Sequence, residues 1–254
     1  MDVEIEVERI KNFIIKIFQE SKTDGIIIGL SGGIDSALTA TLCIHAVGIK
    51  RVFALILPCH SIEFDLNDAK FVADHLGINY KIIDLSESYD VFLGALLQDK
   101  EINIIVKANL KSRIRMCSLY FYANQMNYLV AGTGNKSEDD IGYFTKYGDG
   151  GVDFLPIQHL YKHEVRKMAR FLQIPEKIVD RKPSAGLWDG QTDEDEISQV
   201  LGFPVTYDVL DEMLDNISNN IYDPNDKKYR TLIELREKNK HKLNIPPALK
   251  RELK

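Results

Sequence analysis

The chain has 254 residues, of which 44% are hydrophobic, and this length and composition suit one domain with one substantial core. Its formal net charge of -6 at pH 7 leaves no broad basic surface, so we expect a small-molecule substrate and no nucleic-acid partner. No change in composition marks a second globular unit, and residues 1–254 are therefore predicted to form a single domain.

Patterns typical of helices and strands alternate along the chain. Apolar residues recur at helical spacing over residues 3–21, and a β-branched run at 25–30 predicts a buried strand. Similar patterns predict further helices over residues 37–47, 65–76, 89–98, 102–125, 161–172, 207–219 and 228–240, and further strands over 52–57, 80–85 and 128–131. This order predicts an α/β fold with a doubly wound, mostly parallel sheet and extra C-terminal helices.

A short polar loop, residues 31–36 with the sequence Ser-Gly-Gly-Ile-Asp-Ser, joins the first strand to the next helix. Its glycines allow a phosphate to approach the backbone, and its serines add hydroxyl donors at the helix start. Asp35 would repel a phosphate unless a divalent cation joined the two groups. The loop therefore predicts a site for a nucleoside triphosphate bound with Mg²⁺.

Other interpretations of this loop are less consistent with its residues. A kinase-like P-loop requires Lys-Ser or Lys-Thr where Ile34 and Asp35 stand, and the Rossmann fingerprint requires a different glycine spacing. A purely structural strand-to-helix turn, in which Asp35 interacts with the helix dipole, remains the alternative.

A second polar segment follows the strand predicted at 128–131. Residues 132–138 read Gly-Thr-Gly-Asn-Lys-Ser-Glu, and the carboxyl ends of parallel strands meet at one edge of a sheet. We therefore expect this segment and the loop at 31–36 to face one cleft. Residues 182–196 lack clear periodicity and end in an acidic run, which indicates a mobile lid, with a solvated surface loop as the alternative.

The cysteines and histidines show no pattern typical of a metal or disulfide site. Cys43, Cys59 and Cys117 are far apart and lack a Cys-x-x-Cys pair, so we expect buried thiols. His159 and His163 could share a helix face but lack a third ligand, so we expect them to face solvent. The acidic first residues and the short apolar runs indicate a cytoplasmic protein with no membrane partner.

The Ser-Gly-Gly-Ile-Asp-Ser loop resembles the SGGxDS signature of the N-type ATP pyrophosphatases, which have an adenine nucleotide alpha hydrolase-like fold. This motif alone leaves NAD, GMP and asparagine synthetases and tRNA-thiolating enzymes open. Residues 132–138 and 142–153 resemble the central signature of NAD synthetases, and matching segments follow at 107–116, 183–185 and 241–242. The chain therefore resembles the ammonia-dependent NAD synthetases over nearly its whole length.

This resemblance implies a reaction. Deamido-NAD would be amidated to NAD with ammonia and ATP through an NAD-adenylate, with release of AMP and pyrophosphate. No protein nucleophile would be needed, because alignment and charge stabilisation carry such a reaction. No glutamine-hydrolysing segment is recognisable, so ammonia would arrive free or from a separate protein. A non-catalytic ATP-binding sensor and another amide synthetase of this superfamily remain the alternatives.

The resemblance also implies residue roles and a homodimer built around the long helix at 102–125. Implied ATP-binding residues are Gly29, Leu30, Ser31, Gly32, Gly33, Ile34, Asp35, Ser36, Thr133, Lys162 and Ser184. Implied residues for deamido-NAD are Arg113, Lys146, Asp153, His241 and Lys242. Asp35 and Glu138 are the implied Mg²⁺ ligands. Asp139 and Asp140 could serve a second magnesium ion or face water.

Overall fold

The structure is a computed structural model that describes residues 1–96, 102–184, 186 and 190–249. Its central element is a sheet of parallel strands in the order β3-β2-β1-β4. The strands are β1 (Gly25–Gly29), β2 (Val52–Ile56), β3 (Asn79–Ile82) and β4 (Tyr128–Ala131). The chain winds outward from β1 in one direction to β3 and in the other to β4, so the predicted doubly wound parallel sheet is confirmed.

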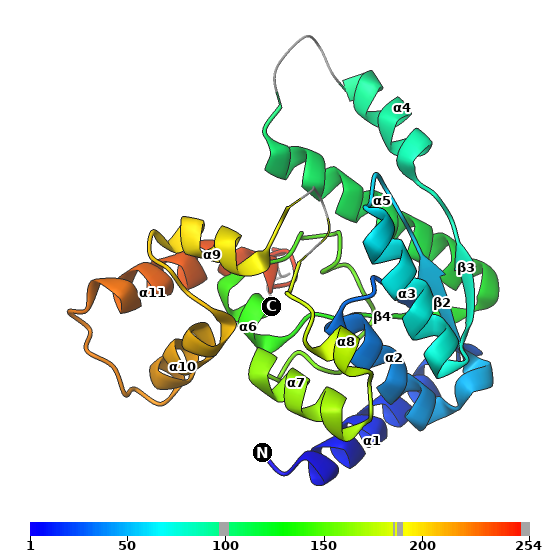
Figure 1. Cartoon of the computed structure of the whole chain (residues 1–254), viewed down its shortest axis with the longest axis horizontal. Coiled ribbons are helices and arrows are strands. Elements are labelled where there is room, and N and C mark those ends of the chain that lie inside the picture. Colours follow the sequence, from blue (N-terminus) through cyan, green and yellow to red (C-terminus); the bar gives the residue numbers. More distant parts are fainter. Residues whose placement is uncertain (97–101, 185, 187–189, 250–254) are drawn as a thin grey trace, which may run out of the picture.

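Helices surround this sheet (Figure 1). They are α1 (Val3–Ser21), α2 (Ile34–Val47), α3 (Glu63–Leu76), α4 (Ser86–Leu96), α5 (Ile104–Met126), α6 (Lys136–Ile141), α7 (Lys162–Phe171), α8 (Glu176–Val179), α9 (Asp193–Leu201), α10 (Tyr207–Ser218) and α11 (Lys227–Asn239), with 3-10 turns at Ile49–Arg51 and Lys240–Lys242. Most predicted elements are present with ends shifted by a few residues. The short helices α6 and α8 were not predicted, because each is too short to show helical periodicity.

The two faces of the sheet bury different helices. Ile26 and Ile28 of β1 belong to a cluster with residues of α1, α2 and α7, whereas Ile27 belongs to a cluster with residues of α4 and α5. This alternation follows from the period of two along a strand, because successive side chains point to opposite faces. The β-branched run of β1 is therefore apolar throughout, as a strand covered on both faces requires.

The C-terminal helices bury an apolar cluster of their own. Leu201 of α9, Leu210 of α10 and Leu232 of α11 pack together with residues of α6 and Tyr161, and these helices lie on one side of the molecule in Figure 1. We expected them to add to the core around the sheet. Their apolar faces instead meet one another across α6, which connects this cluster to the carboxyl end of β4.

Three expectations from the sequence need correction. Residues 193–196 do not belong to a lid loop: they form the first turn of α9, capped by the Thr192 side chain and favoured by acidic residues at a helix start. Cys117 is exposed on α5, whereas Cys43 and Cys59 are buried as expected. His159 precedes α7 and so shares no helix with His163.

The structure describes the remaining part of the predicted lid, residues 182–192, only in part. Residues 185 and 187–189 lie outside the described residues, and residues 182–184 and 190–192 contain no regular helix or strand. Among the described residues, none of the helices combines the length and the apolar character needed to cross a membrane.

Candidate active site

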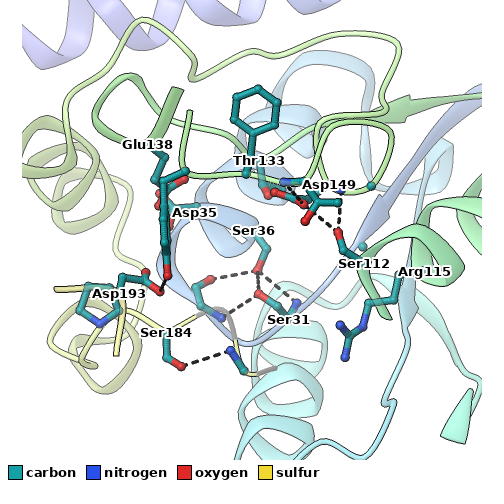
Figure 2. Close-up of a pocket in the computed structure, with 18 of the residues that line it drawn as sticks. Ser31, Asp35, Ser36, Ser112, Arg115, Thr133, Glu138, Asp149, Ser184 and Asp193 are labelled. Atoms are coloured by element: carbon teal, nitrogen blue, oxygen red, sulfur yellow. Dashed lines mark hydrogen bonds between the residues drawn. The ribbon is translucent and has the colours of Figure 1, made fainter. Parts of the chain in front are cut away.

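A cavity of about 530 Å³ opens at the carboxyl ends of β1, β2 and β4. Its walls include the loop after β1, the segment after β4, the start of α7 and the segment before α9 (Figure 2). Of the residues implied for ATP, all except Gly32 line this cavity, and Glu138 lines it as well. The structure therefore brings together segments that are more than a hundred residues apart in the sequence, as expected from parallel-strand topology.

The loop between β1 and α2 is folded around its own hydroxyls. Ser36 Oγ donates to the Gly33 carbonyl at 2.9 Å and lies 3.1 Å from Ser31 Oγ, and Gly33 N donates to Ser31 Oγ at 3.3 Å. Gly33 is the N-cap of α2 and offers no side chain to the first N–H groups of the helix. These N–H groups therefore point toward the position that a phosphate would take.

Gly32 does not line the cavity because it packs against α3. Its φ of +80° is unfavourable for other residues, and a Cβ built there would lie 2.7 Å from the backbone nitrogen of Ala69. Gly32 is thus required for the conformation of the loop, whereas Gly33 borders the cavity itself.

Two carboxylates share one buried ammonium beside this loop. Lys162 Nζ lies 2.6 Å from Asp35 Oδ2 and 3.1 Å from Glu138 Oε1, and the lysine is only 1% exposed. Asp35 is in the first turn of α2, Glu138 is in the first turn of α6, and Lys162 begins α7. Figure 2 shows Asp35 and Glu138 next to each other on the same wall of the cavity.

Asn135, which we did not predict as a site residue, joins the Asp35 carboxylate to the backbone of Glu138. Its Nδ2 donates to Asp35 Oδ1 at 3.0 Å, and its Oδ1 accepts from the Glu138 backbone N–H at 3.1 Å. Asn135 is fully buried and is the N-cap of α6. Its position before an acidic residue at N3 was a recognisable capping signal in the sequence.

The three carboxylates of Asp35, Glu138 and Asp193 outnumber the one ammonium of Lys162 in this part of the site. Burial raises the pKa of Glu138 to about 8; Lys162 opposes the shift, and the nearby charges of Asp35 and Asp193 add to it. Burial alone would lower the pKa of Lys162, but the surrounding carboxylates raise it above its ordinary value, so the ammonium is retained. The site is therefore suited to accept additional positive charge.

A magnesium ion fits these residues. Mg²⁺ is commonly bound by one or two carboxylates together with substrate phosphate oxygens and water, and the ammonium of Lys162 already occupies a cation's place between Asp35 and Glu138. Among the described residues, no group of three or more His, Cys, Asp or Glu side chains is arranged to hold a metal ion by itself. The remaining ligands would therefore have to come from a nucleotide and water.

A second unpredicted group of hydrogen bonds surrounds Glu138. The Tyr207 hydroxyl lies 3.2 Å from Glu138 Oε1 and 3.3 Å from Asp193 Oδ2, and the Tyr143 hydroxyl contacts both Asp193 and Glu196. Asp193 is 5% exposed and begins α9. Nothing in the local sequence indicated these contacts, because they depend on how α9 and α10 pack against α6.

The opposite wall of the cavity carries another unpredicted cation. Arg115 of α5 donates from Nε to the Leu57 carbonyl at 2.9 Å and from Nη2 to Ser61 Oγ at 3.2 Å, and it borders the cavity after β2. Thr133 and Ser184 also border the cavity, and Ser184 Oγ accepts from the Gly186 N–H at 3.1 Å.

The residues implied for deamido-NAD lie mostly outside this cavity. Arg113 Nη2 is 3.4 Å from the Lys146 carbonyl, and Lys146 Nζ donates to the His241 carbonyl at 2.6 Å, so these three form one connected group. Lys242 borders the cavity and donates to the Gly142 and Phe144 carbonyls at 2.7 and 3.0 Å.

Asp153 has a different environment in the described structure. Its Oδ2 accepts from the Val130 N–H at 2.7 Å, and its Oδ1 accepts from the Tyr120 hydroxyl at 3.0 Å. These contacts fix the segment after residue 151 against β4 and α5.

Asp139 and Asp140 do not border the cavity. Asp139 Oδ2 accepts from Gln158 at 2.6 Å, and burial raises its pKa to about 6. Asp140 lies 3.6 Å from Arg236 of α11. In the described structure, these two carboxylates therefore face protein partners.

Comparison with known proteins gives consistent results. The NAD synthase family profile matches residues 6–246. The NH(3)-dependent NAD(+) synthetase of Archaeoglobus fulgidus is 47% identical over 250 residues, which are 98% of this chain and 97% of that protein. The solved structure of NMN synthetase from Francisella tularensis has a TM-score of 0.86 and 34% identity, with 100% of both chains covered. That of the NH3-dependent NAD synthetase from Campylobacter jejuni, in complex with the nitrate ion, has a TM-score of 0.81 and 33% identity, with 98% of this chain and 100% of that chain covered.

Proposed function

The chain belongs to the NAD synthase family, and on that premise we propose that it amidates deamido-NAD to NAD with ammonia and ATP. The observation that carries this proposal is the arrangement of Asp35, Glu138 and Lys162 next to a phosphate-binding loop, within a chain that matches ammonia-dependent NAD synthetases over nearly its full length.

The reaction has two steps. The nicotinate carboxylate attacks the α-phosphorus of ATP, a new C–O–P linkage forms, and pyrophosphate leaves. Ammonia then attacks the acyl carbon of the NAD-adenylate, the C–N bond forms, one N–H proton is lost to solvent, and AMP leaves with the electron pair of the broken C–O bond. Both steps redistribute negative charge on phosphate oxygens, so alignment and fixed positive groups can accelerate them without a protein nucleophile.

The phosphate end of the cavity has the groups that the first step needs. Backbone N–H groups after Ser31 would bind the departing phosphates, and Lys162 would stabilise the charge that develops on them. Asp35 and Glu138 would hold magnesium, which neutralises the polyphosphate when bound. Thr133 and Ser184 would contact ATP from the two sides of the cavity.

The connected group of Arg113, Lys146 and His241 would bind deamido-NAD together with Asp153 and Lys242. Arginine and lysine side chains are suited to its pyrophosphate and carboxylate. The contacts of Arg113 with the Lys146 carbonyl and of Lys146 with the His241 carbonyl place these residues side by side, which supports a common ligand.

We also propose a homodimer in which α4 and α5 contribute to the interface. Val91 and Phe92 on α4 and Ile105 and Phe121 on α5 are more than half exposed, although all four side chains are large and apolar. Such a surface favours association. Sedimentation of the purified protein at working concentration would test this, and a monomer there would contradict the dimer.

The test of the activity is a complete reaction with ATP, magnesium, deamido-NAD and ammonium, in which each component is omitted in turn. NAD, AMP and pyrophosphate should form in equal amounts only in the complete mixture. Binding of ATP without product would instead support a nucleotide sensor. Faster turnover of nicotinate mononucleotide than of deamido-NAD would assign this chain the activity named for the Francisella tularensis relative, and AMP release only with xanthosine monophosphate would indicate a different amide synthetase.

A further inference from the structure

Helix α10 lies outside the layers around the sheet (Figure 1), and its residues do not line the cavity, but Tyr207 on this helix contacts Glu138, which does. Tyr207 and Asp211 are four residues apart and therefore lie on the same side of this helix. Tyr207 is 1% exposed and Asp211 is 2% exposed, so both polar groups are buried toward α6 and α7. Burial of a tyrosine hydroxyl and a carboxylate on one face is costly unless each has partners.

Tyr207 contacts the side chains of the site. Its hydroxyl is within hydrogen-bond distance of Glu138 and Asp193, and its ring centroid lies 4.8 Å from Lys162 Nζ. Glu138 thus has a hydrogen-bond donor that does not depend on Lys162, and Lys162 has an aromatic face beside it.

Asp211 contacts Ser137 and His163, the chain neighbours of Glu138 and Lys162. Its Oδ1 accepts from the Ser137 hydroxyl, and Ser137 Oγ accepts from the Lys162 N–H at 2.9 Å. Its Oδ2 accepts from the His163 N–H at 3.0 Å and lies 2.8 Å from His163 Nδ1. The buried Asp211 carboxylate therefore connects the start of α7 to Ser137, which precedes Glu138. The N-terminus of α7 favours the negative charge of this carboxylate.

We propose that Tyr207 and Asp211 are positioning residues that hold Glu138 and Lys162 at the separation required by the phosphates of ATP and their magnesium ion. Tyr207 acts on the side chains of the pair, and Asp211 acts through the neighbouring residues Ser137 and His163. This inference rests on the proposed function. It assigns to helix α10 a part of an arrangement that the sequence motifs place in the segments after β1 and β4 and at the start of α7.

Tyr207→Phe is the first test, because it removes the hydroxyl and keeps the buried ring. We expect this variant to bind ATP about tenfold more weakly in the presence of magnesium, as follows from loss of one hydrogen bond to a charged group. Calorimetric titration with ATP and magnesium, without deamido-NAD, measures this directly. The KM for deamido-NAD should stay within about twofold, because the hydroxyl is not in the group around Arg113.

Asp211→Asn is the second test, with Asp208→Asn as its matched control. Asp208 is on the same helix and also pairs with α7, through Arg166 at 3.0 Å, but its side chain is 74% exposed. We expect Asp211→Asn to lower kcat and ATP affinity by about tenfold or more, because an amide cannot accept from all three donors. Asp208→Asn should remain within about twofold of the unmodified protein, since exposed ion pairs contribute little.

Stability measurements separate positioning from folding. Tyr207→Phe should melt close to the unmodified protein while binding ATP more weakly, a combination that loss of packing alone would not produce. If Asp211→Asn does not fold, Ser137→Ala removes the bridging hydroxyl from the other side and should give the same loss of ATP affinity. Tyr207→Phe and Ser137→Ala with unchanged ATP affinity and unchanged kcat would overturn the inference.

The inference and the proposed function can fail separately. Absence of NAD formation by the unmodified protein would contradict the function, whereas ATP binding would still report on the positioning of Glu138 and Lys162. Normal NAD formation with variants that match the unmodified protein would contradict only the positioning role.

Discussion

The two ends of the site are built in different ways. At the phosphate end, Lys162 is almost completely buried and its ammonium contacts two carboxylates. At the outer end, Arg113 is exposed and its side chain contacts the Lys146 carbonyl, and Lys146 likewise donates to a carbonyl. The first arrangement is fixed before a ligand arrives, whereas the second can exchange carbonyl contacts for contacts with a ligand.

This difference indicates a division of labour. Preorganised charges in a buried place act most strongly where charge develops during reaction, so the phosphate end should control kcat. Exposed cations that change partners should contribute mainly to binding, so the outer end should control KM. Substitutions at the two ends can confirm or contradict this division.

The largest effect is expected for Asp35→Asn. This variant removes one of the two carboxylates proposed for magnesium and should lower kcat by about 100- to 1,000-fold, with a higher magnesium requirement. Asp24→Asn is a suitable control, because Asp24 lies before the opposite end of β1 and accepts from Asn127 at 3.0 Å. Full activity of Asp35→Asn over a magnesium titration would contradict the proposed metal site.

Lys162→Met should have the next largest effect. The variant keeps the length of the side chain and removes the ammonium, so kcat/KM for ATP should fall by about 10- to 100-fold. Lys167→Met, on the exposed side of the same helix, should show no such loss.

The stability of the Lys162→Met variant should also depend on pH. Two largely buried carboxylates would lose their shared cation, so the free energy of unfolding at pH 9 should fall by about 3 kcal/mol. The pKa of Glu138 is already raised to about 8 in the folded protein, so lowering the pH from 9 to 6 protonates it and should reduce this destabilisation. Denaturation by urea at both pH values would measure the change. Equal destabilisation at pH 6 and 9 would argue against the raised pKa.

A smaller effect is expected at the outer end. Arg113→Gln should raise the KM for deamido-NAD by about fivefold to tenfold and leave kcat and the KM for ATP nearly unchanged. Lys240→Gln is the control, because Lys240 is exposed nearby and pairs with Glu237 at 3.3 Å. A lower kcat of Arg113→Gln without a change in its KM for deamido-NAD would contradict the proposed division of roles between the two ends.

The smallest effect concerns stability. The pKa of Asp139 is raised from 3.8 to about 6, so the folded protein binds more protons than the unfolded chain between these values, and this group destabilises the fold increasingly as the pH rises through that window. Asp139→Asn should therefore raise Tm by about 2–4 °C above pH 7 and by less at pH 4. Thermal melts at both pH values would test this, and a lower Tm at pH 8 would show that the carboxylate stabilises the fold.

The sequence predicts the sheet and the phosphate loop well, because both depend on short-range patterns. The β-branched run of β1 and the glycines after it specify a buried strand and a tight turn within about a dozen residues. The carboxyl ends of parallel strands then place residues 31–36 and 132–138 at one edge without any knowledge of side-chain packing.

The sequence could not predict the partners of the site residues. Lys162 was interpreted as a phosphate ligand, but its two carboxylate partners depend on the approach of α2, α6 and α7. Tyr207 and Asp193 have no local motif, since the hydrogen bonds of Tyr207 with Glu138 and with Asp193 arise from helix packing. Amphipathic spacing indicates which face of a helix is buried but not which residue of a neighbouring helix it meets.

The contacts that define the phosphate end connect distant parts of the chain. Lys162 and Asp35 are 127 positions apart, Ser137 and Asp211 are 74 apart, and Glu138 and Tyr207 are 69 apart. Contacts of such long range form late, because long loops must close before they can be made. The parallel pairing of β1 with β4, in which Gly25 meets Tyr128, is of similar range and should also form late. During refolding, the helices can therefore form before ATP binding returns, and recovery of ATP affinity would report a late stage of folding.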